Sequence, residues 1–180
     1  MNLLGPDSTT EQRRKLYAKY MAAETEFWRC HREAAAVLHF TALGYSRPDG
    51  QTSDHWLDLK KLTWEPEFYR YVRDSFAPTG LMIDFFSEQL TAGTTLSIPV
   101  ITINDLNREW NGPVTLRIRS GKRSCFDVTK SCRVEPQGKA KLVFNLTVPS
   151  EPGAYTIEAE LLGHDGQPVR SVRDVRVEVE

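Results

Sequence analysis

The spacing of apolar residues changes near residue 80 and divides the chain into two parts. Before that point, apolar side chains recur every three or four residues, which is the period of an amphipathic helix. From Leu81 onward they alternate with polar residues, which is the period of a half-buried strand. The pattern predicts an α+β chain in two parts, with a helix-rich segment over residues 1–80 and an all-β domain over residues 81–180.

The first helix is predicted to begin at a capping box. In this motif the Ser8 hydroxyl accepts a hydrogen bond from the Glu11 amide, and the Glu11 side chain reaches back to the Ser8 amide. The apolar face of the helix is then expected to contain residues at three- and four-residue spacing, namely Leu16, Tyr20, Phe27, His31 and Ala35.

The run over residues 37–43 is β-branched, aromatic and nearly all apolar, and it ends at Gly44. It favours a buried parallel strand, although periodicity alone leaves a buried helix open. Residues 44–64 are predicted to form a long loop with a turn at Pro48-Asp49-Gly50. The loop holds Trp56 and Trp64, which either form an exposed stacking surface or, as aromatic residues more commonly do, bury against the base of the loop.

A second helix is predicted to begin at Pro66, because the first helical position needs no amide donor. Phe68, Val72 and Phe76 lie at four-residue spacing and form its expected apolar face. The proline and glycine in residues 78–80 (PTG) end the helix.

About seven alternating segments follow from Leu81, separated every ~8–12 residues by turn signals such as Asn111-Gly112-Pro113. This arrangement is typical of an immunoglobulin-like β-sandwich, although the Cys–Trp–Cys core of antibody domains is absent. The apolar phase slips between Val100 and Ile101, beside Pro99. The slip predicts a β-bulge or a strand that changes sheets.

Composition narrows the function classes. The 180 residues are 40% hydrophobic and 26% charged, with a formal net charge of -1. A near-neutral chain is a poor nucleic-acid binder, because phosphate neutralisation needs a basic face. No apolar run is long enough to span a bilayer. The N-terminus lacks the pattern of a signal peptide, so the chain as written is expected in the cytoplasm, or in the periplasm or medium if it is the tail of an exported enzyme.

Neither a cofactor nor a metal site is expected. The three cysteines give no disulfide framework. Cys125 and Cys132 could face each other across a turn, but two separate thiols are the favoured interpretation. The four histidines are scattered, and the sequence contains no P-loop, no GxSxG and no HExxH motif.

Three stretches in order carry a family resemblance: AAVLHFTALGY, PEFYRYVRDSFAP and GLMIDFFSEQLTAGTTLSIPVITINDLNREWNGPVTLRI. Together they resemble the C-terminal end of a large glycoside hydrolase of the family 2 type, the β-galactosidase and β-glucuronidase superfamily. Residues 75–78 (SFAP) and Asn104-Asp105 are the most family-like words. The resemblance implies that the helix-rich segment is the last βα unit of a TIM barrel and that an immunoglobulin-like domain follows it.

The same resemblance implies where sugar would lie. Active sites of such barrels sit at the C-terminal ends of the strands, on the loops that follow them. Tyr45, Asp54, His55 and Trp56 would then lie near the sugar-binding mouth as a wall or stacking platform, with Asp54 hydrogen-bonding sugar hydroxyls. The family often has a tryptophan at the end of this strand. Here the strand has none, and Tyr45 or Trp56 could substitute.

The resemblance does not supply a complete catalytic site. Retaining glycosidases need two carboxylates roughly 5–5.5 Å apart, and in this family both come from barrel strands that would precede Met1. The chain is therefore expected to be a non-catalytic fragment that braces the barrel and lines the sugar site, inactive alone. Its expected partners are the rest of the barrel, or a second copy covering the apolar surface over residues 16–43, and carbohydrate.

Two alternatives stay open. The chain could be a stand-alone carbohydrate-binding module that stacks sugars on an exposed aromatic residue, with Trp110 in NREWNG as the candidate. It could also be a protein-interaction module, in which the helical part offers a surface to a partner.

Overall fold

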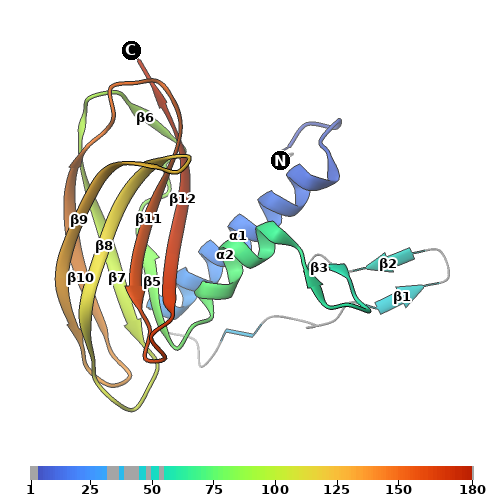
Figure 1. The fold of residues 1–180 in the computed structure, drawn as a ribbon, viewed down its shortest axis with the longest axis horizontal. Helices are drawn as coiled ribbons and strands as arrows, with labels where there is room; N and C mark the ends of the chain where they lie inside the picture. The colour runs from blue at the N-terminus through green and yellow to red at the C-terminus, as the bar shows by residue number, and fades with distance from the viewer. Residues whose placement is uncertain (1–3, 32–36, 39–44, 48–49, 53–54, 180) are drawn as a thin grey trace. The chain divides into compact units, whose positions relative to one another are not determined.

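The computed structural model describes residues 4–31, 37–38, 45–47, 50–52 and 55–179. The chain divides into two units, Met1–Phe76 (unit 1) and Ala77–Glu180 (unit 2). Unit 1 carries the helices and unit 2 is a β-sandwich, so the chain is of the α+β class (Figure 1). In the part of the chain that the structure describes, no helix is long and apolar enough to cross a membrane.

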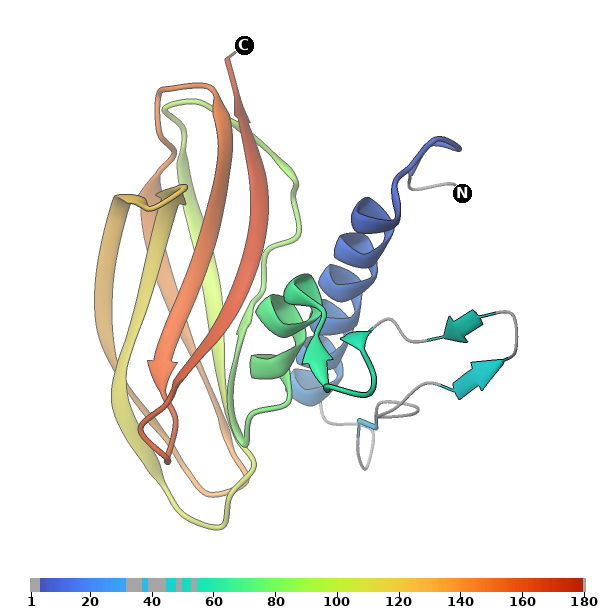
Figure 2. The same ribbon diagram turned by 45° about the vertical axis from the view of Figure 1, so that its right-hand side comes forward.

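Unit 1 contains two helices and two short hairpins. Its elements are α1 (Thr10–His31), β1 (Tyr45–Arg47), β2 (Gly50–Thr52), β3 (Trp56–Asp58), β4 (Thr63–Trp64) and α2 (Pro66–Ser75). β1 pairs with β2, and β3 pairs with β4, both antiparallel, so the region predicted as a loop contains regular structure. α1 and α2 lie side by side (Figure 2). The strand predicted over residues 37–43 falls outside the described residues except for Val37 and Leu38, which have no regular structure.

The capping box of α1 is one residue later than predicted. The Gln12 amide donates to Thr9 Oγ1 at 3.1 Å, and the Thr9 amide donates to Gln12 Oε1 at 2.8 Å. Both Ser8–Glu11 and Thr9–Gln12 fit the same sequence rule. The Ser8 carbonyl and hydroxyl instead accept from the Arg13 guanidinium. The prediction of Ser8 as the cap was therefore wrong.

The buried face of α1 also differs from the prediction. Ala18, Ala22 and Cys30 are buried, whereas Tyr20 and Phe27 are exposed. Small side chains at four-residue spacing allow a neighbouring helix to approach closely, and α2 packs against α1. Periodicity favoured the large residues because it counts apolar character and not size. As a result, aromatic side chains remain on the surface of α1.

α2 begins as predicted. Glu65 is its N-cap, and Pro66 occupies the first turn, where no amide donor is needed. Glu65 Oε2 accepts a hydrogen bond of 2.6 Å from the Phe68 amide. Phe68 and Val72 are buried, as the four-residue spacing predicts, and the helix ends at Ser75.

Unit 2 is built from strands that follow one another with short connections. They are β5 (Thr79–Ile83), β6 (Gln89–Thr91), β7 (Thr95–Asn104), β8 (Trp110–Ser120), β9 (Arg123–Val134), β10 (Lys139–Thr147), β11 (Gly153–Leu162) and β12 (Pro168–Glu178). One sheet has the order β10-β7-β5, and the other has the order β6-β12-β11-β8-β9. The pairs are antiparallel except for the parallel pairing of β12 with β6.

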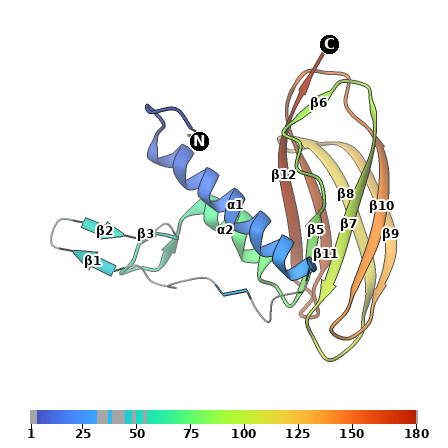
Figure 3. The ribbon, with the colours of Figure 1, turned by 180° about the vertical axis from the view of Figure 1, so that it is seen from behind.

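The core of unit 2 lies between the two sheets (Figure 3). Alternate residues of each strand point into it, which is the expected arrangement for two packed sheets. Phe144 of β10, Ile98 of β7, Leu116 of β8 and Ile157 of β11 are fully buried there. The alternating pattern that predicted a β-sandwich is confirmed by this packing.

β7 contains neither a bulge nor a change of sheet, so that prediction was wrong. Its pairing with β10 runs in regular register along the strand. The inward positions that follow Val100 are occupied by Thr102 and Asn104, both buried in unit 2. The apolar alternation breaks in the sequence only because polar residues take two inward positions, while Ile101 and Ile103 lie on the other face of the strand.

Trp110 is a core residue and not an exposed loop residue. It begins β8, is buried, and its indole N–H donates to the Leu162 carbonyl at 2.9 Å. The predicted turn at Asn111-Gly112-Pro113 is instead part of this strand. Gly112 is needed for close approach, since a Cβ there would lie 2.9 Å from the Trp110 ring. This burial removes Trp110 as a sugar-stacking candidate.

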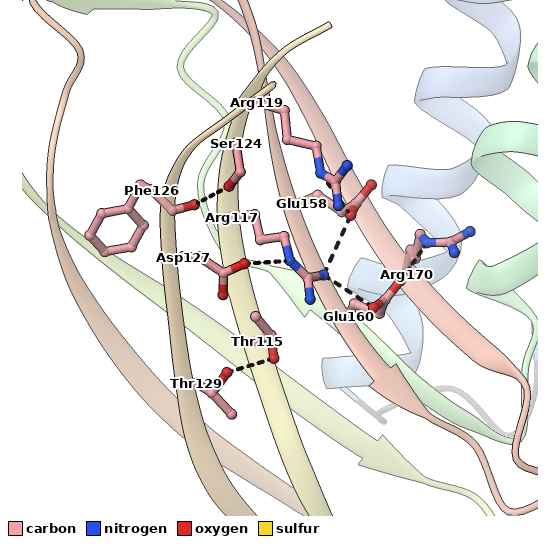
Figure 4. A network of polar contacts seen from close by, with 10 residues as sticks. All are labelled: Thr115, Arg117, Arg119, Ser124, Phe126, Asp127, Thr129, Glu158, Glu160 and Arg170. Carbon is pink, nitrogen blue, oxygen red and sulfur yellow. Dashed lines mark hydrogen bonds and ion pairs between the residues drawn. The ribbon is translucent and has the colours of Figure 1, made fainter. Parts of the chain in front are cut away.

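Cys125 and Cys132 lie in the single strand β9 and are both free thiols, as the favoured interpretation predicted. Charged and polar side chains connect neighbouring strands on the solvent face of the larger sheet (Figure 4). Arg117 of β8 donates to Asp127 of β9 at 2.9 Å and to Glu160 of β11 at 3.1 Å. Arg170 of β12 donates to the other oxygen of Glu160 at 2.8 Å. Cross-strand pairs of this kind help to hold strand register.

Candidate functional site

The strongest candidate site in unit 1 begins at the β3–β4 hairpin. Trp56 and Trp64 are directly opposite each other in the pairing of the two strands. Their rings are stacked with centroids 3.8 Å apart and an angle of 22° between the planes. Trp56 is 9% exposed and Trp64 is 43% exposed. One indole is therefore buried as a base, and the other is fixed on it with much of its surface accessible to solvent.

The first turn of α2, which follows Trp64 in the chain, also packs against this tryptophan pair. Trp64 is followed directly by the cap Glu65, so the hairpin and the helix are joined without a loop. One turn into α2, the Phe68 ring lies 5.9 Å from the Trp64 ring, at 9° between planes. Because Phe68 is buried in unit 1, the aromatic cluster is anchored to the helix core.

His55 links the cluster to α1. Its imidazole is buried, and its centroid lies 4.5 Å from that of Phe68. The Tyr17 hydroxyl of α1 lies 3.3 Å from His55 Nε2, and the His55 carbonyl accepts from the Glu65 amide at 2.7 Å. These contacts fix the imidazole between α1 and α2.

A cavity of about 260 Å³ opens beside these residues. Its walls are mostly apolar, and they are formed by His55, Trp56, Trp64, Phe68, Val72, Arg73 and Phe76. Arg73 and His55 are the polar groups among them. The Arg73 guanidinium bonds to Asp74 Oδ1 at 2.5 Å and to the Tyr69 hydroxyl at 2.9 Å. The hydrogen bond to Asp74 is the main cause that raises the pKa of Arg73, so this side chain is cationic.

This arrangement is suited to binding. An apolar, aromatic cavity with a few fixed polar groups is the usual form of a small-ligand site. The two carboxylates next to it already have roles, since Glu65 caps α2 and Asp74 bonds to Arg73. Among the described residues, no group of three or more His, Cys, Asp or Glu side chains could hold a metal ion.

The predicted site residues divide between this cavity and other places. His55 and Trp56 line it. Tyr45 begins β1, where it pairs with Thr52. Asp54 lies outside the described residues. A sugar-binding role for all four stays a prediction.

Sequence reasoning missed the lining residues contributed by α2 and underrated Trp64. Phe68, Val72 and Phe76 recur every four residues, and this spacing was assigned to a helix core. These three residues also line the cavity. Phe76 lies just beyond the last helical residue, Ser75, and is partly exposed. The sequence signal that could have indicated the site is the position of Trp64, which directly precedes Glu65, the N-cap of α2.

Comparison with known proteins gives no family for the chain. No protein-family model matches it, and no curated protein sequence matches it. Among solved structures, a β-glucosidase from Listeria innocua is similar with a TM-score of 0.44 and 13% identity, over 57% of this chain and 16% of that one.

Two other solved structures show a similar degree of likeness. A superoxide reductase from Ignicoccus hospitalis has a TM-score of 0.42 and 15% identity over 57% of this chain and 82% of that one. A cycloisomaltooligosaccharide glucanotransferase from Paenibacillus has a TM-score of 0.41 and 16% identity over 56% of this chain and 13% of that one. This chain therefore spans less than a fifth of the glucosidase and of the glucanotransferase.

Proposed function

We propose that this chain is the non-catalytic C-terminal portion of a carbohydrate-cleaving glycoside hydrolase, and that Trp64 provides a stacking surface for one sugar ring. The observation that carries the proposal is the Trp56–Trp64 stack at the mouth of an apolar cavity. An exposed aromatic face buries the C–H face of a pyranose, while fixed polar groups bond to its hydroxyls.

The geometry favours a rigid platform. Trp64 is held by Trp56 on one side and by Phe68 at the helix start, so little side-chain freedom is lost when a ligand binds. The cavity of about 260 Å³ lies just below the range of roughly 300–1,000 Å³ that drug-sized ligands occupy. It therefore suits one sugar ring better than an oligosaccharide.

The sequence resemblance supports the same interpretation from another direction. In enzymes of the family 2 type, the loop after the last barrel strand would approach the sugar. The residues of this loop that line the cavity are His55, Trp56 and Trp64. Cavity and resemblance thus agree on the same short segment.

The bracing part of the proposal is supported by the surface of α1. Tyr20 and Phe27 lie seven residues apart on one face, and Trp28 is next to them; all three are exposed. Aromatic side chains gathered on one helix surface indicate a surface that a partner covers. We assign this partner as the rest of a glycosidase barrel, with a second copy of the chain as the competing outcome.

The stacking role is tested by titrating the chain with methyl β-D-glucopyranoside and methyl β-D-galactopyranoside, using saturation-transfer NMR. We expect saturable binding of at least one glycoside near the millimolar range, which corresponds to about −4 kcal/mol. Trp64→Ala should abolish binding. Trp28→Ala removes another exposed tryptophan of unit 1 that does not line the cavity, so this control should bind like the unchanged chain.

Equal binding by Trp64→Ala and Trp28→Ala would contradict the stacking role. The bracing role has its own test, which is the DNA sequence upstream of the Met1 codon. An in-frame barrel with two strand-end glutamates would support it. A stop codon directly upstream would contradict the barrel as the partner. If sedimentation also showed dimers that Phe27→Glu abolishes, the partner would be a second copy of the chain.

A further inference from the structure

Unit 2 contains a second cavity, of about 210 Å³, at one end of the sandwich. Three segments that are far apart in sequence form it: the start of β5, the connection between β7 and β8, and the turn between β11 and β12. Thr79, Arg108, His164 and Asp165 are the polar side chains that these segments contribute, the last two from the turn between β11 and β12. The rest of the wall is largely apolar and includes Leu106 and Val169.

Two residues that line this cavity each have a buried polar atom with no hydrogen-bond partner among the described residues. Thr79 is 2% exposed, and its Oγ1 makes no hydrogen bond in the described part of the chain. The same holds for Nε2 of His164. Thr79 has the same parity in β5 as Leu81 and Ile83, which point into the core, so its hydroxyl is directed to the interior. Buried polar groups are nearly always hydrogen-bonded, and those without a protein partner call for a missing one.

Arg108 and Asp165 are the charged side chains of the cavity wall, and both act on His164. Burial is the main cause that lowers the pKa of His164, and the neighbouring Arg108 lowers it further. Asp165, on the same turn, acts in the opposite direction but more weakly. Its Oδ1 also accepts from the Gln167 amide at 3.0 Å, which holds the carboxylate in the turn. Because this carboxylate oxygen already accepts from a backbone amide, the charge left for a ligand is that of Arg108, which favours an anion.

We propose that this cavity binds a small carboxylate. The Thr79 hydroxyl and the Arg108 guanidinium are donors from two different segments, and His164 Nε2 adds a third when it carries the ring proton; a carboxylate accepts several such bonds at once. Arg108 makes no ion pair among the described residues, so its charge is available to the ligand. The apolar wall at Leu106 and Val169 fits a short aliphatic stem, which distinguishes a carboxylate from inorganic phosphate.

The test is calorimetric titration of the full chain with sodium butyrate, with butyramide as the uncharged isostere and inorganic phosphate as the second anion. We expect butyrate to bind saturably and butyramide not to bind. In NMR, butyrate should raise the pKa of His164, because a bound anion favours the imidazolium.

Arg108→Gln should weaken butyrate binding by roughly tenfold to a hundredfold, the loss typical of a charge-assisted hydrogen bond. Arg176→Gln removes another exposed positive charge, one that pairs with Glu178 and does not line the cavity, and should leave binding unchanged. Thr79→Val should also weaken binding without destabilising the free chain, because it removes an unpaired buried hydroxyl at nearly constant shape.

Three results would overturn the proposal: no saturable binding of butyrate, binding of phosphate in preference to butyrate, or equal effects of Arg108→Gln and Arg176→Gln. Since Arg108 is on the surface, its variant remains informative even if Thr79→Val fails to fold. The residues tested lie in unit 2, so the result is distinguishable from that of the glycoside titration.

Discussion

Replacing Asn104 by alanine should strongly destabilise unit 2. Asn104 is fully buried, and its amide nitrogen donates to the carbonyls of Arg108 at 2.7 Å and Glu135 at 3.2 Å. Its side-chain oxygen accepts from the Leu106 amide at 3.2 Å. A single side chain thus satisfies backbone groups of the β7–β8 connection and of the segment after β9.

The magnitude follows from these bonds. A hydrogen bond contributes about 0.5–1.5 kcal/mol net, and a buried group left unpaired costs about 1–3 kcal/mol. Losing three such bonds in Asn104→Ala should therefore lower the free energy of unfolding by about 2–4 kcal/mol. With a urea slope of about 1–3 kcal/mol per molar for a small domain, the unfolding midpoint should fall by roughly 1 M.

The assay is urea unfolding followed by the loss of native amide signals of unit 2 in NMR spectra, which separates the strands of unit 2 from the helices of unit 1. Asn107→Ala is the matched control, because Asn107 lies in the same connection, is exposed, and accepts one hydrogen bond from Gln137. We expect this control to change the free energy of unfolding by less than about 1 kcal/mol. Equal losses for the two variants would refute the reasoning that the buried amide organises the connection.

Three further predictions concern charge, capping and packing. Burial raises the pKa of Glu160, but hydrogen bonds from Arg170 and Arg117 outweigh it and lower this pKa below 4.5. The ionised Glu160 therefore contributes its full stabilisation above pH 4.5, and this contribution is lost as the pH falls through the lowered pKa. The urea midpoint of Glu160→Gln should then fall less between pH 5 and 3 than that of the unchanged chain. Glu65→Ala removes the cap of α2, which should cost about 0.5–2 kcal/mol and speed hydrogen exchange of the Phe68 amide. Gly112→Ala places a Cβ against the buried Trp110 ring, so unit 2 should lose about 1–3 kcal/mol in thermal unfolding.

The sandwich could be predicted because its signal is redundant. Each strand repeats the same alternation, and inward residues such as Ile98 and Ile157 are buried where the period of two places them. The start of α2 could also be predicted, because Pro66 has a fixed backbone angle and needs no amide donor in the first turn. These features need only local information, which a single sequence contains.

The errors arose where size or tertiary contact decided the outcome. Ala18 and Ala22 form the buried face of α1 because small residues allow close approach, whereas periodicity favoured Tyr20 and Phe27. Gly112 was interpreted as a turn signal, but it provides room for the Trp110 ring. The stack of Trp56 on Trp64 depends on strand pairing, so the sequence could indicate the two residues but not their contact.

The break in alternation after Val100 connects the fold of unit 2 with its carboxylate site. Asn104 takes an inward position at the end of β7, opposite Thr79 of β5, and its amide holds the carbonyl of Arg108. Asn104 therefore holds the backbone of one lining residue, Arg108, and lies next to another, Thr79, in the sheet. Asn104→Ala should then weaken butyrate binding even in conditions where unit 2 remains folded, while Asn107→Ala should not. Unchanged butyrate binding by folded Asn104→Ala would show that the β7–β8 connection positions Arg108 without this amide. The buried Asn104 would then contribute to the stability of unit 2 and not to binding.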